Sequence, residues 1–365
     1  MDRTSTYHSD GRPALLLAAV LALTAACGTA PGSQDESASA AAGADPAAPS
    51  TESAESAESA ESAAAVGRPV IADDFPDPDV LEVDGTYYAY ATNYGRTNVR
   101  VATSKDLQEW DLQRTDALPD LPGWVIPGKT WAPEVTRRED GTFVMYATAT
   151  NFSPAVQCIA VATATDPLGP FEVQGEEMLV CPEDLGGAID ASTFVDDDGT
   201  TYLLWKNDGN CCGYDTWLYA APLSEDLLTL AGDPVQLITQ DQAWEGDLVE
   251  APTLLRREGR YVLLYSANAY GGEQYATGYA TAEAIEGPWT KHPEPLLSTD
   301  LADGEVIGPG GQDVVVAPDG SDVLVFHSWD DAITYRGMHV APLDWVDGEP
   351  VVRLDGRAGG PSVSP

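Results

Sequence analysis

The stretch DGTYYAYAT at residues 84–92 places an acidic residue and a glycine directly before a run of aromatic and small side chains. An Asp-Gly pair between apolar runs is a strong signal for a β-hairpin, and the run after it is typical of a buried strand. The same phrase occurs four more times, as DGTFVMYAT, DGTTYLLWK, EGRYVLLYS and DGSDVLVFH. Its glycines lie at positions 85, 141, 199, 259 and 320, so the unit recurs every 56 to 61 residues.

The second half of each unit predicts two further strands joined by a turn, as in NVRVATSKDLQEWDL at 98–112 and TGYATAEAIEGPWTK at 277–291. Four antiparallel strands in each of five units predict an all-β fold, the five-bladed β-propeller. A β-sandwich does not explain five even repeats, and a β-helix has much shorter ones. Residues 67–365 are therefore expected to form one propeller domain.

The charge of the chain restricts its partners. Fifty-nine acidic residues against 18 basic ones give a net charge of −41, and residues 67–365 hold 50 of the acids and 16 of the bases. Nucleic acid, anionic membrane surfaces and polyanionic substrates are disfavoured by repulsion. The composition favours a neutral ligand, and we expect a monomer.

The N-terminal 66 residues have the composition of an export signal and a linker. Residues 14–23, ALLLAAVLAL, are too short to span a bilayer and match the apolar centre of a secretory signal. Small residues before Cys27 resemble a bacterial lipoprotein cleavage site, although simple secretion with an unused Cys is the alternative. Residues 28–66, rich in Ala, Ser and Glu, predict a disordered linker. The chain is therefore expected to be exported and either lipid-anchored through Cys27 or secreted.

Four further cysteines are present, and an even number in an exported chain favours disulfides over a metal site. No CxxC pair occurs, so a zinc site is not supported. We expect a bond between Cys158 and Cys181. The adjacent Cys211 and Cys212 could form a vicinal bridge or remain free.

Polar residues recur seven to nine positions before each repeat glycine, where the innermost strand of a blade is expected to begin at the central channel. They are Asp77, Glu134, Asp190, Glu250 and Gln312. Carboxylates that converge in one pocket cannot all remain ionised, so one can serve as an acid and another as a base. Glycoside hydrolysis requires such a pair.

The chain resembles glycoside hydrolase family 43, five-bladed propeller enzymes that act on arabinan and xylan, over residues 68–355. The resemblance depends on the order and spacing of FPDPDVLEVDGTYYAYAT, TWAPEV, GGAIDASTFVDDDGTTYLLWKNDGN, LVEAPTLLRREGRYVLLYSAN, GPGGQDVVVAPDG and VFHSWD. It implies an inverting mechanism with Asp77 as general base and Glu250 as general acid. Asp190 would hold the proton on Glu250. Asp79, two residues after Asp77, is the competing base on sequence alone.

Other residues near these motifs are candidate substrate contacts. Aromatic side chains stack on sugar rings, and polar side chains orient the hydroxyls. The candidates are Phe75, Trp131, Glu134, Phe194, Lys206, Gln312 and Arg336. Arg336 resembles a family arginine near the base, and core packing is the alternative for the aromatic residues.

No cofactor is expected. Many relatives have His in the GPG phrase of the last blade, where it helps to hold a hydrated metal ion. Here the phrase continues with Gly311 and Gln312, which argues against a structural calcium ion. His327 is the other candidate near the axis, and a hydrogen-bonded core histidine is the alternative.

The sequence therefore predicts an inverting glycosidase for pentose-containing plant cell-wall polysaccharides or oligosaccharides. It favours α-L-arabinofuranosyl over β-xylosyl linkages. The alternatives are a non-catalytic surface sugar-binding propeller lipoprotein and a related five-bladed fructan or sucrose enzyme that retains configuration.

Overall fold

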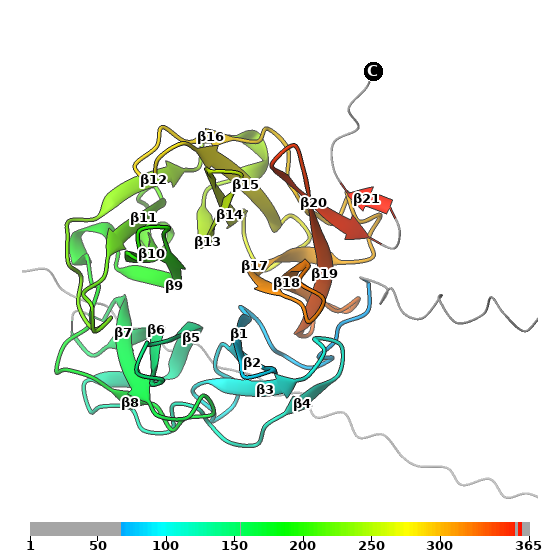
Figure 1. The fold of residues 1–365 in the computed structure, drawn as a ribbon. Helices are drawn as coiled ribbons and strands as arrows, with labels where there is room; N and C mark the ends of the chain where they lie inside the picture. Colours follow the sequence, from blue (N-terminus) through cyan, green and yellow to red (C-terminus); the bar gives the residue numbers. More distant parts are fainter. Residues whose placement is uncertain (1–66, 154, 355–356, 360–365) are drawn as a thin grey trace, which may run out of the picture. The chain divides into compact units, whose positions relative to one another are not determined.

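A computed structural model describes residues 67–153, 155–354 and 357–359. In this part of the chain the fold is an all-β ring of five sheets around a central channel, as predicted (Figure 1). The signal, the linker and Cys27 lie outside the described residues. No helix in the described ranges is long and apolar enough to cross a membrane.

Each blade is an antiparallel meander whose first strand is innermost. Blades 1 and 2 comprise β1 (Asp79–Val83), β2 (Thr86–Ala91), β3 (Arg100–Ser104), β4 (Trp110–Leu112), β5 (Val125–Arg137), β6 (Phe143–Asn151), β7 (Gln157–Ala164) and β8 (Glu172–Val173). Blades 3 and 4 comprise β9 (Ala188–Val195), β10 (Thr201–Asn207), β11 (Trp217–Pro222), β12 (Val235–Thr239), β13 (Val249–Arg257), β14 (Arg260–Ala267), β15 (Ala276–Ala282) and β16 (Thr290–Lys291). Blade 5 comprises β17 (Ile307–Val316), β18 (Asp322–Trp329), β19 (Arg336–Val346), β20 (Glu349–Leu354) and β21 (Arg357–Gly359).

The last sheet differs from the prediction because β21 pairs with β20 and gives blade 5 a fifth strand. Three short 3₁₀ turns complete the described structure: η1 (Glu183–Leu185), η2 (Gly209–Cys211) and η3 (Ala243–Glu245).

The repeated acid-Gly pairs form the hairpins between the first and second strands, on the face of the ring away from the start of each inner strand. At Asp84-Gly85 and Glu258-Gly259 both residues have positive φ, as a type I′ turn requires. In the other three hairpins only the glycine is left-handed. These turns fix the register of the two strands that position the polar residues of the channel.

The apolar side chains form five principal clusters, each between two neighbouring blades. The cluster between blades 5 and 1, for example, joins Phe75 and Val80 to Val325 and Val340. Burying these faces removes apolar surface from water, the main stabilising contribution to a fold of this kind. The ring therefore depends on contacts between all five neighbouring pairs of blades.

Ring closure uses no strand shared between the first and last blades, because all of blade 5 comes from the C-terminal part of the chain. Instead, the segment before β1 lies along β19, where Phe75 N donates to Arg336 O at 2.8 Å. Val80 N on β1 also donates to Asp313 Oδ2 on β17 at 2.9 Å.

The two cysteine pairs are both bonded. A disulfide joins Cys158 on β7 to Cys181, the pair favoured by the sequence. Cys211 and Cys212 form a vicinal disulfide, which the sequence left open.

Candidate active site

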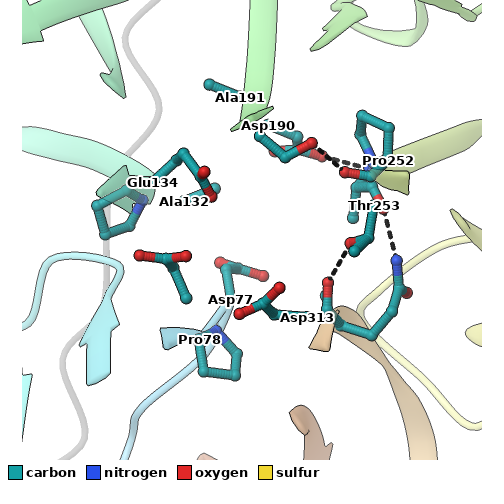
Figure 2. Close-up of a pocket in the computed structure, with 15 residues that line it drawn as sticks. Asp77, Pro78, Ala132, Glu134, Asp190, Ala191, Pro252, Thr253 and Asp313 are labelled. Carbon is teal, nitrogen blue, oxygen red and sulfur yellow. Dashed lines mark hydrogen bonds between the residues drawn. The ribbon is translucent and has the colours of Figure 1, made fainter. Parts of the chain in front are cut away.

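Every blade has a left-handed residue where its inner strand enters the channel. These residues are Asp77, Ala132, Asp190, Ala251 and Gly311, with φ between 40° and 57°. In blades 2 to 5 the register between the inner strand and its neighbour also shifts close to this position. Irregularities of this kind redirect side chains and are common beside active sites. Here they direct Asp77 and Asp190 into one pocket, which residues of all five blades line (Figure 2).

The five polar residues predicted at one level therefore lie at different levels of the channel. Asp77 and Asp190 are the left-handed residues, Glu250 precedes the left-handed residue of its blade, and Gln312 follows its own. Glu134 is two positions further along its strand. The sequence spacing located the correct segments, but it could not resolve the bend that separates these levels.

The Asp77 carboxylate is surrounded by groups that stabilise its charge. Thr92 Oγ1 donates to Asp77 Oδ2 at 2.7 Å, and Arg336 Nη1 lies 3.6 Å from Oδ1. The Asp77 backbone N–H donates to His327 Nδ1 at 3.0 Å. Burial alone would raise the pKa of Asp77, but Arg336, His327 and Thr92 together hold it well below its ordinary value. Asp77 is therefore ionised over the whole working range of a neutral or acidic enzyme.

Glu250 is the second buried carboxyl, and it pairs with a lysine. Lys206 Nζ donates to Glu250 Oε2 at 2.8 Å, with side chains that are 0% and 10% exposed. Burial lowers the pKa of Lys206, but the charges of Glu250 and Asp190 outweigh it and raise the pKa. Lys206, predicted as a substrate contact, is thus enclosed beneath the acid.

Asp190 lies close enough to Glu250 for the two charges to interact. Burial and then the charge of Glu250 raise the pKa of Asp190 well above its ordinary value. The backbone of Ala251 also donates to Asp190 Oδ2 at 3.1 Å, which connects blades 3 and 4. The raised pKa of Asp190 favours its protonated form, whereas the lowered pKa of Asp77 on the other side of the pocket keeps that carboxyl ionised.

A second layer of polar residues forms the floor of the pocket, two positions beyond each left-handed residue. These residues are Asp79, Glu134, Ser192, Thr253 and Asp313. Each one hydrogen-bonds to the inner strand of the next blade: the three carboxylates accept from backbone N–H groups, and the two hydroxyls donate to carbonyls. These hydrogen bonds connect every neighbouring pair of blades. Asp79, which competed with Asp77 for the role of base on sequence alone, belongs to this floor layer.

The carboxyls of Asp79, Glu134 and Asp313 also influence one another. Burial raises the pKa of all three, and the charge of Glu134 raises those of Asp79 and Asp313 further. For Asp313 the pKa rises to about 7. Figure 2 shows Glu134, Asp77, Asp190 and Asp313 turned toward a common space.

Two of the aromatic residues predicted to stack on sugar rings lie in the core instead. Phe75 is fully buried between blades 5 and 1, and its ring faces the Arg100 guanidinium at 5.8 Å. Phe194 packs edge-on against Tyr261 in the core between blades 3 and 4. Both predictions were wrong. Each Phe lies an even number of residues from Asp77 or Asp190, but the left-handed backbone at Asp77 and Asp190 breaks the regular alternation of side chains. Trp131 is partly exposed and precedes Ala132 of the pocket lining.

Gln312 lines the pocket but has its amide engaged by the protein. Its Oε1 accepts from Ser266 Oγ at 2.7 Å, and its Nε2 donates to Ala251 O at 2.6 Å. At the neighbouring Gly311, a Cβ would lie 2.6 Å from His327 Nδ1 and 2.8 Å from Asp77 Oδ1. A larger side chain would therefore displace the base or His327. Among the described residues, no group of three or more His, Cys, Asp or Glu side chains is placed to hold a metal ion.

A second set of channel residues lies close to the ends of the second strands, and only Lys206 and His327 of this set were candidates from the sequence. These residues are Thr92, Thr148, Lys206, Ser266 and His327, each seven positions after the glycine of its repeat. Thr92, Lys206 and His327 contact the catalytic acids as described above. Thr148 Oγ1 accepts from the Asp190 backbone N–H, and Ser266 Oγ accepts from that of Gly311. Their common position, seven residues after the repeat glycine, is the signal that could have identified Thr92 from the sequence.

An ionised Asp77 facing a buried Asp190 of raised pKa in the channel of a five-bladed propeller is the kind of carboxyl arrangement that glycoside hydrolysis requires. Residues 66–350 match the family model of Glycosyl hydrolases family 43, and the chain belongs to this family.

Curated relatives and solved structures agree with this assignment. The chain is 28% identical to the beta-D-galactofuranosidase xynD of Aspergillus niger over 68% of this chain and 75% of the relative. It is 30% identical to alpha-L-arabinofuranosidase 43 of Humicola insolens over 64% of this chain but only half of that longer protein. The structure of an endo-1,4-beta-xylanase from Bacteroides thetaiotaomicron aligns with a TM-score of 0.66 at 31% identity, covering 80% of this chain and 97% of the other.

Proposed function

We propose that the protein hydrolyses glycosidic bonds of pentose-containing plant cell-wall glycans with inversion of configuration. The observation that supports this most strongly is the difference in protonation across one pocket. Asp77 is held ionised with the help of Arg336, whereas burial and the charge of the neighbouring Glu250 raise the pKa of Asp190. An inverting enzyme needs a base and an acid on opposite sides of the scissile bond.

In the proposed reaction Asp77 removes a proton from a water molecule, which attacks the anomeric carbon. Glu250 donates its proton to the departing oxygen, and Asp190 keeps that proton available in the resting pair. Arg336 and Thr92 hold the Asp77 carboxylate in place through the contacts described above. Lys206 fixes Glu250 from below and does not itself exchange a proton with the substrate.

For the substrate we favour α-L-arabinofuranosyl linkages over β-xylosyl ones. A galactofuranosidase, an arabinofuranosidase and an endo-arabinanase of Bacillus subtilis are among the curated relatives, and all three names specify furanosides or arabinan. A putative beta-xylosidase and the xylanase structure are the competing relatives. None of these relatives is named as a non-catalytic binding protein.

A panel of substrates tests this proposal. We expect release of nitrophenol from the α-L-arabinofuranoside to exceed release from the β-D-xyloside and the β-D-galactofuranoside, and we expect reducing sugar from linear arabinan. Proton NMR of the first product should show the anomer of inverted configuration. Retained configuration would indicate a covalent nucleophile and refute the assignment of Asp77 as a base.

We also propose that the enzyme is an exported monomer, anchored by lipid on Cys27, acting on neutral glycans without a cofactor. The support is the sequence before Cys27 and the word "extracellular" in the name of the Bacillus subtilis relative. Expression of the full chain in a bacterial host should place activity in the membrane fraction, and Cys27→Ala should release it. Equal release of both forms would refute the anchor and leave the proposed reaction untouched.

A further inference from the structure

The loops between the second and third strands of the blades lie on the catalytic face, because each one begins just after a residue that contacts the site. Each loop exposes one large apolar side chain. These are Tyr94 (51% exposed), Phe152 (60%), Tyr214 (54%), Tyr270 (54%) and, in blade 5, Ile333 (40%). All four exposed aromatic residues of the described chain are in this set, which we call the aromatic rim.

The opposite face shows a different composition. Its exposed large apolar residues are the valines at the ends of β9, β17 and β19, namely Val195, Val316 and Val346. Scattered apolar residues are normal on a protein surface. One aromatic side chain at the same topological position in four successive blades is a pattern, and all four belong to loops on the face at which the inner strands begin.

Two rim residues are held with one ring face against an arginine. The Arg336 guanidinium lies 4.9 Å from the centre of the Tyr270 ring, and its Nη1 lies 3.6 Å from Asp77 Oδ1. One arginine therefore contacts both a rim residue and the proposed base. The Arg100 guanidinium lies 4.8 Å from the centre of the Tyr94 ring and is paired with Asp73. Cation–π contacts of this kind fix a ring before a ligand arrives. Because both tyrosines remain half exposed, their outer surfaces are available.

The Tyr214 side chain projects from a loop that is constrained in another way. The vicinal disulfide Cys211–Cys212 lies in the same loop, and Tyr214 N donates to Gly209 O at 3.0 Å. In blade 2, Phe152 N donates to Trp124 O at 3.0 Å. The rim residues therefore lie in loops with defined backbone contacts.

We propose that the aromatic rim binds the sugar rings of a neutral polysaccharide chain that extends beyond the residue being cleaved. Aromatic rings stack on the C–H faces of sugars, and an exposed apolar surface around a pocket is typical of a ligand-binding groove. The excess of acidic residues in the domain disfavours a polyanionic glycan. The inference rests on the proposed function and adds that the preferred substrate is a polymer rather than a short oligosaccharide.

The test compares two substrates across single variants. Tyr94→Ala, Phe152→Ala and Tyr214→Ala should each lower the ratio of kcat/KM for linear arabinan to kcat/KM for the nitrophenyl arabinofuranoside by about 2- to 10-fold. Tyr94→Phe should keep the wild-type ratio, since the ring is retained. Tyr270 is left out because its ring packs against Arg336.

The valines of the opposite face provide matched controls. Val195→Ala, Val316→Ala and Val346→Ala remove exposed apolar groups of comparable accessibility and should leave the ratio unchanged. A ratio that stays at the wild-type value in all three rim variants, or that falls equally in the valine variants, would overturn the proposal.

Affinity electrophoresis separates this proposal from the proposed reaction. Gels that contain arabinan or arabinoxylan should retard the wild-type chain, and the triple Tyr94, Phe152 and Tyr214 alanine variant should migrate freely. Polygalacturonic acid should retard neither form. Retardation without hydrolysis would refute the proposed reaction alone. Absence of retardation by both neutral glycans would refute the rim even if the nitrophenyl substrate is cleaved.

Discussion

Replacing Lys206 by Met tests whether the lysine beneath Glu250 supports catalysis as well as folding. The change removes an ammonium group that is fully buried and 2.8 Å from the Glu250 carboxylate. Leaving one member of a buried ion pair without its partner costs about 3–5 kcal/mol. We therefore expect the free energy of unfolding to fall by about this amount at pH 7. We also expect kcat to fall by roughly 10- to 100-fold, because the acid is no longer held in position.

The chain contains a matched control on the next blade. Lys291 Nζ lies 2.7 Å from Glu245 Oε1, with side chains that are 7% and 0% exposed, and this pair does not line the pocket. Lys291→Met should therefore destabilise the fold by a similar amount without the loss of kcat. Urea unfolding followed by tryptophan fluorescence measures the first quantity, and initial rates on a nitrophenyl pentoside measure the second.

A double variant completes the test. Adding Glu250→Gln to Lys206→Met removes the uncompensated charge and should recover a large part of the lost stability, although activity stays absent. The reasoning fails if Lys206→Met loses less than about 1 kcal/mol, far below the cost of breaking a buried pair. It also fails if its kcat falls no further than that of Lys291→Met.

Three further predictions concern the carboxyls. Asp77→Asn should lower kcat by roughly 10²–10⁴-fold while arabinan binding on affinity gels persists, and retained turnover would exclude Asp77 as the base. Removing the Arg336 charge with Arg336→Gln raises the pKa of Asp77, so the acidic limb of kcat/KM should move up by at least ~1 pH unit; an unmoved limb would show that Arg336 does not stabilise the ionised base. Because burial and Glu134 raise the pKa of Asp313 to about 7, the folded state takes up this proton more readily than the unfolded chain. Stability from this group should therefore decline from about pH 4 to pH 7, and Asp313→Asn should flatten that decline in urea titrations.

The fold was predictable because the hairpin phrase repeats at an almost constant interval. An acid-Gly turn followed by an apolar run identifies two strands of each blade, and five copies within one domain leave few alternative architectures. The additional strand β21 was not predicted. The pair Asp355-Gly356 before it is a hairpin signal in the sequence, but Arg357–Gly359 has no apolar run that would indicate a buried strand.

The site was predictable only in part, because side-chain direction depends on a backbone bend that the sequence does not state. Asp77, Asp190 and Glu250 were located from their motifs, and the structure brings them into the same channel. Phe75 and Phe194 lie close to those motifs in sequence, but their side chains face the core. Thr92 was missed because a threonine close to the end of a strand is common. Only its position in the repeat, which it shares with Lys206 and His327, distinguishes it.

The junction of blades 5 and 1 is the one seam of the ring where the beginning and end of the domain meet. The same seam carries the proposed base: Arg336 belongs to blade 5 and Asp77 to blade 1, and the two blades are joined here by hydrogen bonds and by the apolar cluster that contains Phe75 and Val325. Warming or mild denaturant that loosens this seam would separate Asp77 from Arg336 even while the other four interfaces stay closed. Inactivation should then precede the loss of β-structure, because opening this one interface is enough to disrupt the site.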